Sequence, residues 1–167
     1  LAYNYFSGEG VTGLNEGRPL FARRPDSRFT LANFMRTHLL SALATLKLGL
    51  DILTEEEKVP VEKLCGHGGF FKTPDVGQRL LSAAVGAPVS VMETAGEGGP
   101  YGMALLAAYG LWREPGETLE DYLDNKVFAN AKASTQMADA ADIAGFRDFL
   151  ARYKRALPVE QAAVESI

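Results

Sequence analysis

Cysteine, long apolar runs and clusters of positive charge are scarce or missing in this sequence, and each shortage excludes a class of protein. The 167 residues include one cysteine, Cys65, so no disulfide forms within the chain, and an intracellular setting fits best. No apolar run approaches the roughly 20 residues of a membrane span, and no signal peptide is recognisable. The formal net charge is −4 and the cations form no cluster along the sequence. We therefore expect a cytoplasmic protein that binds neither membrane nor nucleic acid.

Length and composition indicate one globular domain with a real core. Hydrophobic residues make up 47% of the chain and charged residues 23%, which is ordinary for a globular protein. The chain opens on Leu1, and residues 1–6 read like the interior of a folded unit. We expect residues 1–167 to be a single domain and a piece of a longer protein, with a helical segment over 139–167. A trimmed but complete domain is the alternative.

The longest helical signal covers residues 30–53. Leucine, phenylalanine, methionine and alanine recur there at spacings of three and four, and Thr30 is a suitable N-cap. The second face of this helix is also apolar, so we expect it to be covered on most sides. His38 lies in its first half and is interpreted as a partly buried, hydrogen-bonded residue and not as a catalyst.

The centre of the chain predicts a strand, a glycine-rich turn, a helix and a second strand. Val61, Leu64 and Cys65 predict a short buried strand over 61–66, and Thr73 is the expected N-cap of a helix over 74–85. Residues 88–92 predict the second strand. This order is typical of a βαβ crossover with parallel strands.

A second glycine-rich turn, residues 93–100, runs into a predicted helix over 101–111. In a βαβ unit both turns lie at the carboxyl edge of the sheet, where ligands bind. Further along we expect a short helix over 119–123, a polar connection, a helix over 139–157 and a polar helical tail.

The first glycine-rich turn has four possible interpretations. A P-loop fits Gly66, Lys72 and Thr73 but has Phe71 where its second glycine is required. A dinucleotide turn fits Gly66 and Gly68 but again has Phe71 at its third glycine position. The other two are a nucleotide-binding turn that does not wrap the phosphates, and a tight turn without a ligand.

Several local patterns resemble the C-terminal, nucleotide-binding half of the FGGY carbohydrate kinases. Residues 64–69 (LCGHGG) and 86–89 (GAPV) are similar to the adenosine motif of that family and to the segment that follows it. Residues 102–109 (GMALLAAY) resemble its later small-residue helix, and residues 5–9 (YFSGE) a preceding segment. The helix over 146–153 resembles the closing helix of the xylulokinase and ribulokinase branches. The resemblance extends over nearly the whole chain.

This resemblance implies an α/β fold of the ribonuclease-H-like, actin-like ATPase type, with an incomplete central sheet packed by several helices. It also implies a nucleotide site formed by Gly68, Gly69, Phe70, Lys72, Thr73, Gly98, Gly99 and Gly102. Phe70 and Phe71 depart from the small residues usual in the family. Glu93 and Glu97 are unusual beside an anionic ligand.

The activity implied is transfer of the γ-phosphate of ATP, with Mg²⁺, to a hydroxyl of a pentulose or related sugar. The family's catalytic aspartate and sugar pocket precede this region, and Asp26, Asp51, Asp75 and Asp121 do not match the catalytic position. We therefore name no catalytic residue and expect the 167 residues alone to be inactive. ATP or ADP and a sugar are the implied partners, and a homodimer is left open. The rival hypothesis is an interaction domain that keeps the fold without useful nucleotide binding.

Overall fold

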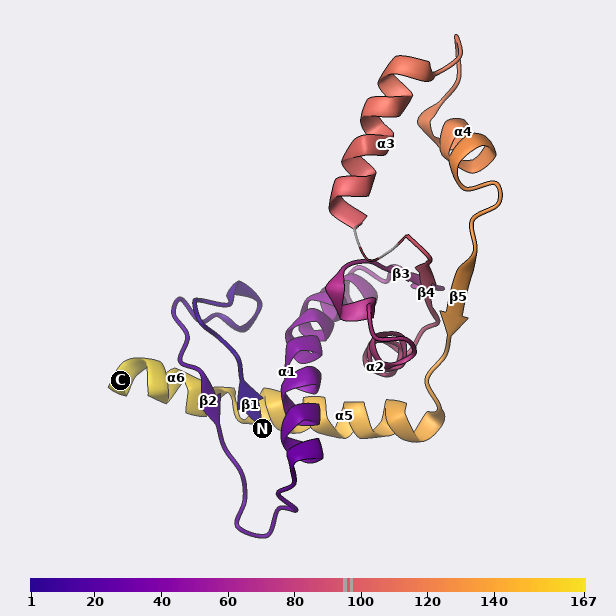
Figure 1. Ribbon diagram of the computed structural model, residues 1–167. Helices are drawn as coiled ribbons and strands as arrows, with labels where there is room; N and C mark the ends of the chain where they lie inside the picture. Colours follow the sequence, from indigo (N-terminus) through magenta and orange to yellow (C-terminus); the bar gives the residue numbers. More distant parts are fainter. Residues whose placement is uncertain (95, 97) are drawn as a thin grey trace. The chain divides into compact units, whose positions relative to one another are not determined.

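The chain forms two compact units in the computed structural model, which describes residues 1–94, 96 and 98–167. The first unit contains Leu1–Glu62, Leu80–Ala87 and Ala138–Ile167, and the second contains Lys63–Arg79 and Pro88–Met137. Within the described residues no helix is both long and apolar enough to cross a bilayer. The strands and α-helices (Figure 1) are β1 (Ala2–Tyr3), β2 (Leu20–Phe21), α1 (Leu31–Asp51), β3 (Leu64–Gly66), α2 (Val76–Val85), β4 (Val89–Met92), α3 (Gly98–Trp112), α4 (Leu119–Tyr122), β5 (Ala133–Gln136), α5 (Ala140–Arg155) and α6 (Leu157–Ser166).

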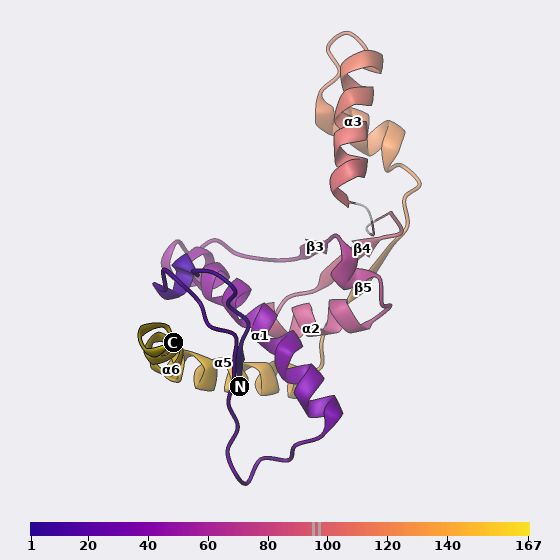
Figure 2. The ribbon, with the colours of Figure 1, turned by 60° about the vertical axis from the view of Figure 1, so that its left-hand side comes forward.

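In the first unit, α1 begins where the sequence predicts. The side chain of Thr30 accepts a hydrogen bond from the backbone N–H of Asn33, which confirms its role as N-cap. An irregular loop over residues 22–30 joins β2 to this helix (Figure 2). The expectation that α1 is covered on most sides is wrong, because only Ser41, Leu43 and Ala44 are buried.

A tyrosine cluster holds the core of the first unit together. Tyr3 and Tyr153 are almost fully buried, and their ring centroids lie 4.6 Å apart. The hydroxyl of Tyr3 donates to the backbone carbonyl of Tyr153 at 2.8 Å, and the hydroxyl of Tyr153 donates to that of Tyr5 at 2.7 Å. These bonds join β1 and the loop after it to α5. They satisfy hydroxyl groups that would otherwise be costly to bury.

The second unit contains a three-stranded sheet in the order β3-β4-β5. Strands β3 and β4 are parallel, with Leu64 opposite Val89, and α2 connects them. The predicted βαβ crossover is therefore confirmed. Strand β5 pairs antiparallel with β4 and lies where the sequence predicts only a polar connection. Cys65 of β3 is exposed and Leu64 is only partly buried, so the prediction of a buried strand is wrong.

Gln78 of α2 is bonded to two strands of this sheet. The residue is 6% exposed, and its side-chain amide donates to the carbonyl oxygens of Val89 at 3.0 Å and Ser134 at 2.9 Å. The hydroxyl of Ser134 in turn donates to the amide oxygen of Gln78 at 3.0 Å. A single buried side chain therefore fixes the start of α2 to β4 and β5.

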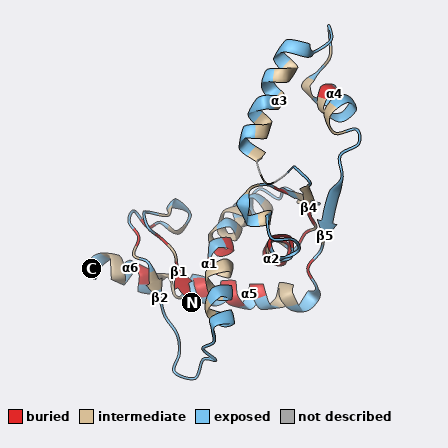
Figure 3. Ribbon diagram, in the orientation of Figure 1, coloured by how far each residue is buried: buried red, intermediate tan, exposed pale blue. Residues whose placement is uncertain are grey.

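Helix α3 is apolar but has no buried residue among those described (Figure 3). Leu111 is 76% exposed and Met103 70% exposed. Tyr109 links this helix to α4, because its hydroxyl donates to the carbonyl of Glu117 just before α4 and its ring packs against Tyr122 with centroids 5.5 Å apart. Several large apolar side chains of α3 are therefore open to solvent within this unit.

Candidate functional site

The first glycine turn follows β3 directly and has an approachable backbone. Gly68 has φ of 96°, a conformation that side-chain-bearing residues rarely adopt. Gly69 begins a short 3-10 helix (Gly69–Phe71), and a Cβ atom added at Gly69 would meet no atom within 4 Å. The turn therefore leaves open space on the side of Gly69, where a ligand can approach the main chain.

Two other glycines near this turn are required by the protein's own phenylalanines. A Cβ at Gly66 would lie 2.4 Å from the ring of Phe71, and one at Gly77 would lie 2.5 Å from the carbonyl oxygen of Phe70. The rings of Phe70 and Phe71 pack edge to face with centroids 5.4 Å apart. Phe71 therefore covers Gly66, which is the first glycine of both the P-loop motif and the dinucleotide-binding motif considered above.

The helix after the first turn begins later than predicted, so Thr73 is not its N-cap. Helix α2 starts at Val76, and Asp75 just before it has φ of 66°. A left-handed residue cannot belong to the first turn of a right-handed helix, which moves the helix start past Pro74. The side chain of Gln136 donates to Asp75 Oδ1 and holds this bend. Thr73 itself is exposed.

The second glycine turn follows β4 and leads into α3. Helix α3 begins at Gly98, three residues before the predicted start at Tyr101. Cβ atoms added at Gly99 or Gly102 would meet no atom within 4 Å. Glu93 is exposed, and Glu97 lies outside the described residues.

The two turns lie against each other. A Cβ at Gly98 would be 2.9 Å from the Cβ of His67, and one at Gly96 would be 3.5 Å from the Cε of Lys72. Because β3 and β4 are parallel, both turns leave the sheet at the carboxyl ends of neighbouring strands. The geometry brings His67 and Lys72 of the first turn against Gly98 and Gly96 of the second, respectively. Within the described residues, no such contact joins Thr73, Gly99 or Gly102 to the opposite turn.

The chemistry available at these turns is that of backbone amides and one lysine. Backbone N–H groups and a helix start favour an anionic group, and bare glycines let it come close. Among the described residues no group of three His, Cys, Asp or Glu side chains could hold a metal ion. His67, which packs against Gly98, was not identified from the sequence as part of the site. Its position between two glycines at the end of a strand was the only available signal.

Comparison with known proteins gives one family and two related structures. The family model of the C-terminal domain of the FGGY family of carbohydrate kinases matches residues 1–111. Crystal structures of a ligand-bound xylulose kinase and of a gluconate kinase, both from Lactobacillus acidophilus, each superpose with a TM-score of 0.59 at 18% identity. No curated protein matches the chain.

These superpositions cover 90% of this chain but 28% of each kinase, so the chain spans less than a third of the length of either structure. At this identity the likeness shows the fold. It confirms the expected α/β class with the actin-like ATPase fold, a small sheet and several helices.

Proposed function

Because the chain belongs to the FGGY family of carbohydrate kinases, we propose that it forms the nucleotide-binding part of an ATP-dependent sugar kinase. The observation that carries the proposal is the packing of two glycine turns at the carboxyl ends of β3 and β4, with His67 against Gly98 and Lys72 against Gly96. An anionic, flat ligand such as a nucleotide needs an approachable backbone and nearby positive charge, and these turns supply both.

In this proposal the open sides of Gly68, Gly69 and Gly99 receive ATP, and Lys72 lies near its phosphates. Gly98, whose own side is covered by His67, joins the two turns beside the ligand. Gly102 belongs to the adjoining helix. Thr73 and Phe70 border the first turn. The fit rests on the space at Gly69 and Gly99, which a side chain would fill. Bound ATP would supply the phosphoryl group, and Mg²⁺ would be held chiefly by its phosphates, since Mg²⁺ typically keeps several waters and takes only one or two carboxylates.

The acceptor is proposed to be a pentulose or related sugar, as in the xylulokinase and ribulokinase branches that the sequence resembles. The related structures carry the names of a xylulose kinase and a gluconate kinase, so the acceptor class extends to sugar acids. We propose that the sugar site and the catalytic base lie outside these 167 residues, and that the 167 residues form one C-terminal domain. A cytoplasmic location and a homodimer belong to the same proposal.

A second candidate is an interaction domain that keeps the fold without binding nucleotide. The observation in its favour is the ring of Phe71, which occupies the space beside Gly66 where a ligand would approach the backbone. Titration calorimetry of the chain with Mg-ATP and with ADP separates the two functions. Binding heat together with a thermal shift supports the kinase, whereas neither effect at millimolar nucleotide supports the interaction domain.

The decisive variant is Gly69→Val. A Cβ atom added there meets no atom within 4 Å, so we expect the fold to survive, but the new side chain fills the approach to the turn. We expect ATP binding to weaken at least about tenfold, because a displaced charged hydrogen bond costs about 1.5 kcal/mol or more. Gly145→Val is the matched control, since Gly145 lies in α5 and is equally open. Equal ATP binding by the two variants would contradict the assignment of the turn.

A further inference from the structure

A pocket of about 500 Å³ lies in the first unit and has no part in the proposed nucleotide turns. Its walls come from the loop between β2 and α1, from the first turns of α1 and from the end of α5. This volume is within the range of small-molecule sites, about 300 to 1,000 Å³. The pocket is therefore large enough for a compact organic ligand.

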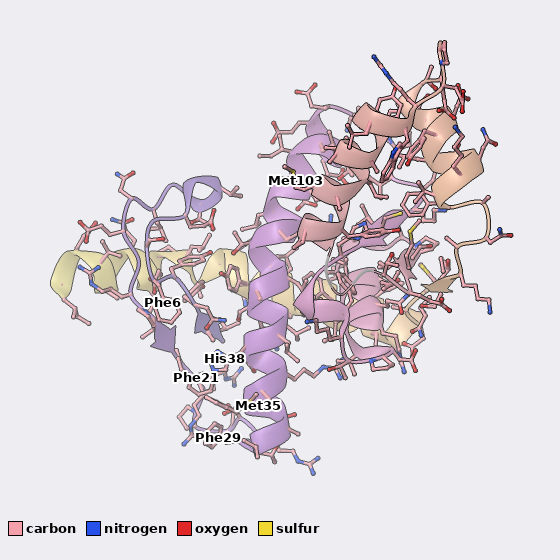
Figure 4. All side chains as sticks on the ribbon, turned by 45° about the horizontal axis from the view of Figure 1, so that its top comes forward. Phe6, Phe21, Phe29, Met35, His38 and Met103 are labelled. Atoms are coloured by element: carbon pink, nitrogen blue, oxygen red, sulfur yellow. The ribbon has the colours of Figure 1, made fainter. Side chains whose placement is uncertain are left out.

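Aromatic rings form one wall of the pocket. Phe21 and Phe34 pack edge to face with centroids 5.1 Å apart, and Phe29 adjoins both at 5.9 and 6.2 Å. Phe29 is nevertheless 57% exposed and Phe21 36% exposed. Figure 4 shows both rings beside the first turns of α1. An exposed pair of phenylalanines in a concave site offers a stacking surface for a flat ring.

The rest of the lining is strongly positive. Five arginines contribute, namely Arg23, Arg24, Arg28, Arg152 and Arg155, and no acidic residue lines the pocket. The expectation that the cations form no cluster is therefore wrong in three dimensions, although the chain as a whole carries a net charge of −4.

Three of these arginines have no counter-ion among the described residues. Arg24 pairs with Asp26 at 2.6 Å, and the guanidinium of Arg23 lies over the ring of Phe29 at 4.9 Å. No ion pair joins Arg28, Arg152 or Arg155 to an acidic group anywhere in residues 1–94, 96 and 98–167. Like charges gathered in one cavity repel, and an anionic ligand relieves that repulsion. Guanidinium forks match the oxygen geometry of a phosphate.

We propose that this pocket binds a small aromatic molecule that carries a phosphate group. The ring stacks on Phe21 and Phe29, and the phosphate is held by Arg28, Arg152 and Arg155. Three unpaired guanidinium groups favour a doubly charged phosphate over a single carboxylate, and the pocket's size favours a small molecule over an extended chain. The site is separate from the proposed ATP turn, so it assigns a second ligand to the protein.

Calorimetry of the whole 167-residue chain with naphthyl phosphate tests the proposal. Naphthol, which lacks the charge, and inorganic phosphate, which lacks the ring, should each bind at least about tenfold more weakly than naphthyl phosphate. The double variant Arg28→Ala, Arg155→Ala should lose about a hundredfold, roughly tenfold for each charged hydrogen bond. Arg147→Ala is the matched control, because Arg147 is an exposed arginine of α5 outside the pocket.

Three results would overturn the proposal. The first is no binding of naphthyl phosphate by the folded chain, with folding checked by circular dichroism. The second is equal binding by the double variant and by Arg147→Ala, which would indicate general attraction between charges. The third is equal binding of inorganic phosphate, which would remove the role of the rings. Gly69→Val should bind naphthyl phosphate as the unmodified chain does, so failure here is distinguishable from failure of the ATP assignment.

Discussion

Replacing Gln78 by glutamate tests how the sheet beneath the glycine turns is held. Q78E keeps the size and shape of the side chain but replaces a double donor with an acceptor. The new carboxylate oxygen would face the carbonyl oxygens of Val89 and Ser134, which the amide nitrogen now contacts at 3.0 and 2.9 Å. The residue is 6% exposed, so water cannot solvate the charge.

The expected cost follows from these contacts. Two lost hydrogen bonds account for about 2 kcal/mol, and an unpaired buried carboxylate brings the total to about 3–5 kcal/mol at neutral pH. Gln78→Met loses these two bonds and also the acceptor of the Ser134 hydroxyl, but it buries no charge, so it should cost only about 1–3 kcal/mol. In Q78E the hydroxyl of Ser134 can still donate to a side-chain oxygen of residue 78. The substitution therefore removes only the two hydrogen bonds that the amide nitrogen of Gln78 donates.

Acid should relieve the defect of Q78E. The buried site disfavours the charged form, so the pKa of the introduced carboxyl is raised in the folded state above its unfolded value of about 4.3. The deficit in stability is therefore smallest below about 4.3, and it grows as pH rises from there through the folded pKa. Urea unfolding followed by circular dichroism at both ends of this window measures it.

The control for Q78E is Gln161→Glu, which makes the same chemical change at an exposed position of α6 and should cost less than about 1 kcal/mol. A Q78E protein within about 0.5 kcal/mol of the unmodified chain at neutral pH would refute the reasoning. So would a deficit that does not shrink in acid. Either result would mean that Gln78 does not donate to β4 and β5 as described.

Three further predictions concern the first unit. Glu160 is fully buried and accepts a backbone N–H at 2.6 Å, so Glu160→Ala should cost about 2–3 kcal/mol in urea unfolding by orphaning that donor. Burial raises the pKa of Tyr153, so stability should fall as pH rises above about 10, and Tyr153→Phe should reduce that slope. Burial opposes ionisation of Asp51, but hydrogen bonds from Lys47 and Lys154 lower its pKa overall. Asp51→Asn should therefore cost about 1 kcal/mol at neutral pH, and the difference should disappear as pH falls below about 3.9.

Each of these predictions has a result that contradicts it. A Glu160→Ala protein as stable as the unmodified chain would mean that water or another group satisfies the donor. An unchanged alkaline slope in Tyr153→Phe would place the titrating groups elsewhere. For Asp51→Asn, a deficit that persists in acid would point to packing and not to charge, and added salt is the independent check because it screens the ion pair.

Local signals explain why part of the fold was predictable. Thr30 carries its own capping oxygen, and apolar spacing of three and four marks α1 without reference to the rest of the chain. His38 also behaves as expected, since its ring nitrogen lies 2.9 Å from Asn4 Oδ1 in a partly buried position.

The features that sequence reasoning missed depend on distant residues. Strand β5 reads Ala-Ser-Thr-Gln, is mostly exposed, and is a strand because β4 offers it an open edge. Arg28 and Arg155 belong to one pocket, yet 126 positions separate them in the chain, so no window of sequence brings their charges together. Asp75 has a positive φ, and this backbone conformation moves the start of α2 to Val76. Residue type alone rarely indicates such a conformation.

The glycines show most clearly where motif reasoning overreaches. In the sequence Gly66, Gly69, Gly98 and Gly99 look alike, and each suggests a place where a ligand approaches the backbone. In the fold, Gly66 is closed by the ring of Phe71 and Gly98 by His67, whereas Gly69 and Gly99 face open space. Packing inside the protein therefore requires glycine at positions 66 and 98. At positions 69 and 99 no protein contact requires glycine, so only a bound ligand would require it there. A nucleotide site built on these turns must depend on Gly69 and Gly99, and substitutions at Gly66 or Gly98 report on folding.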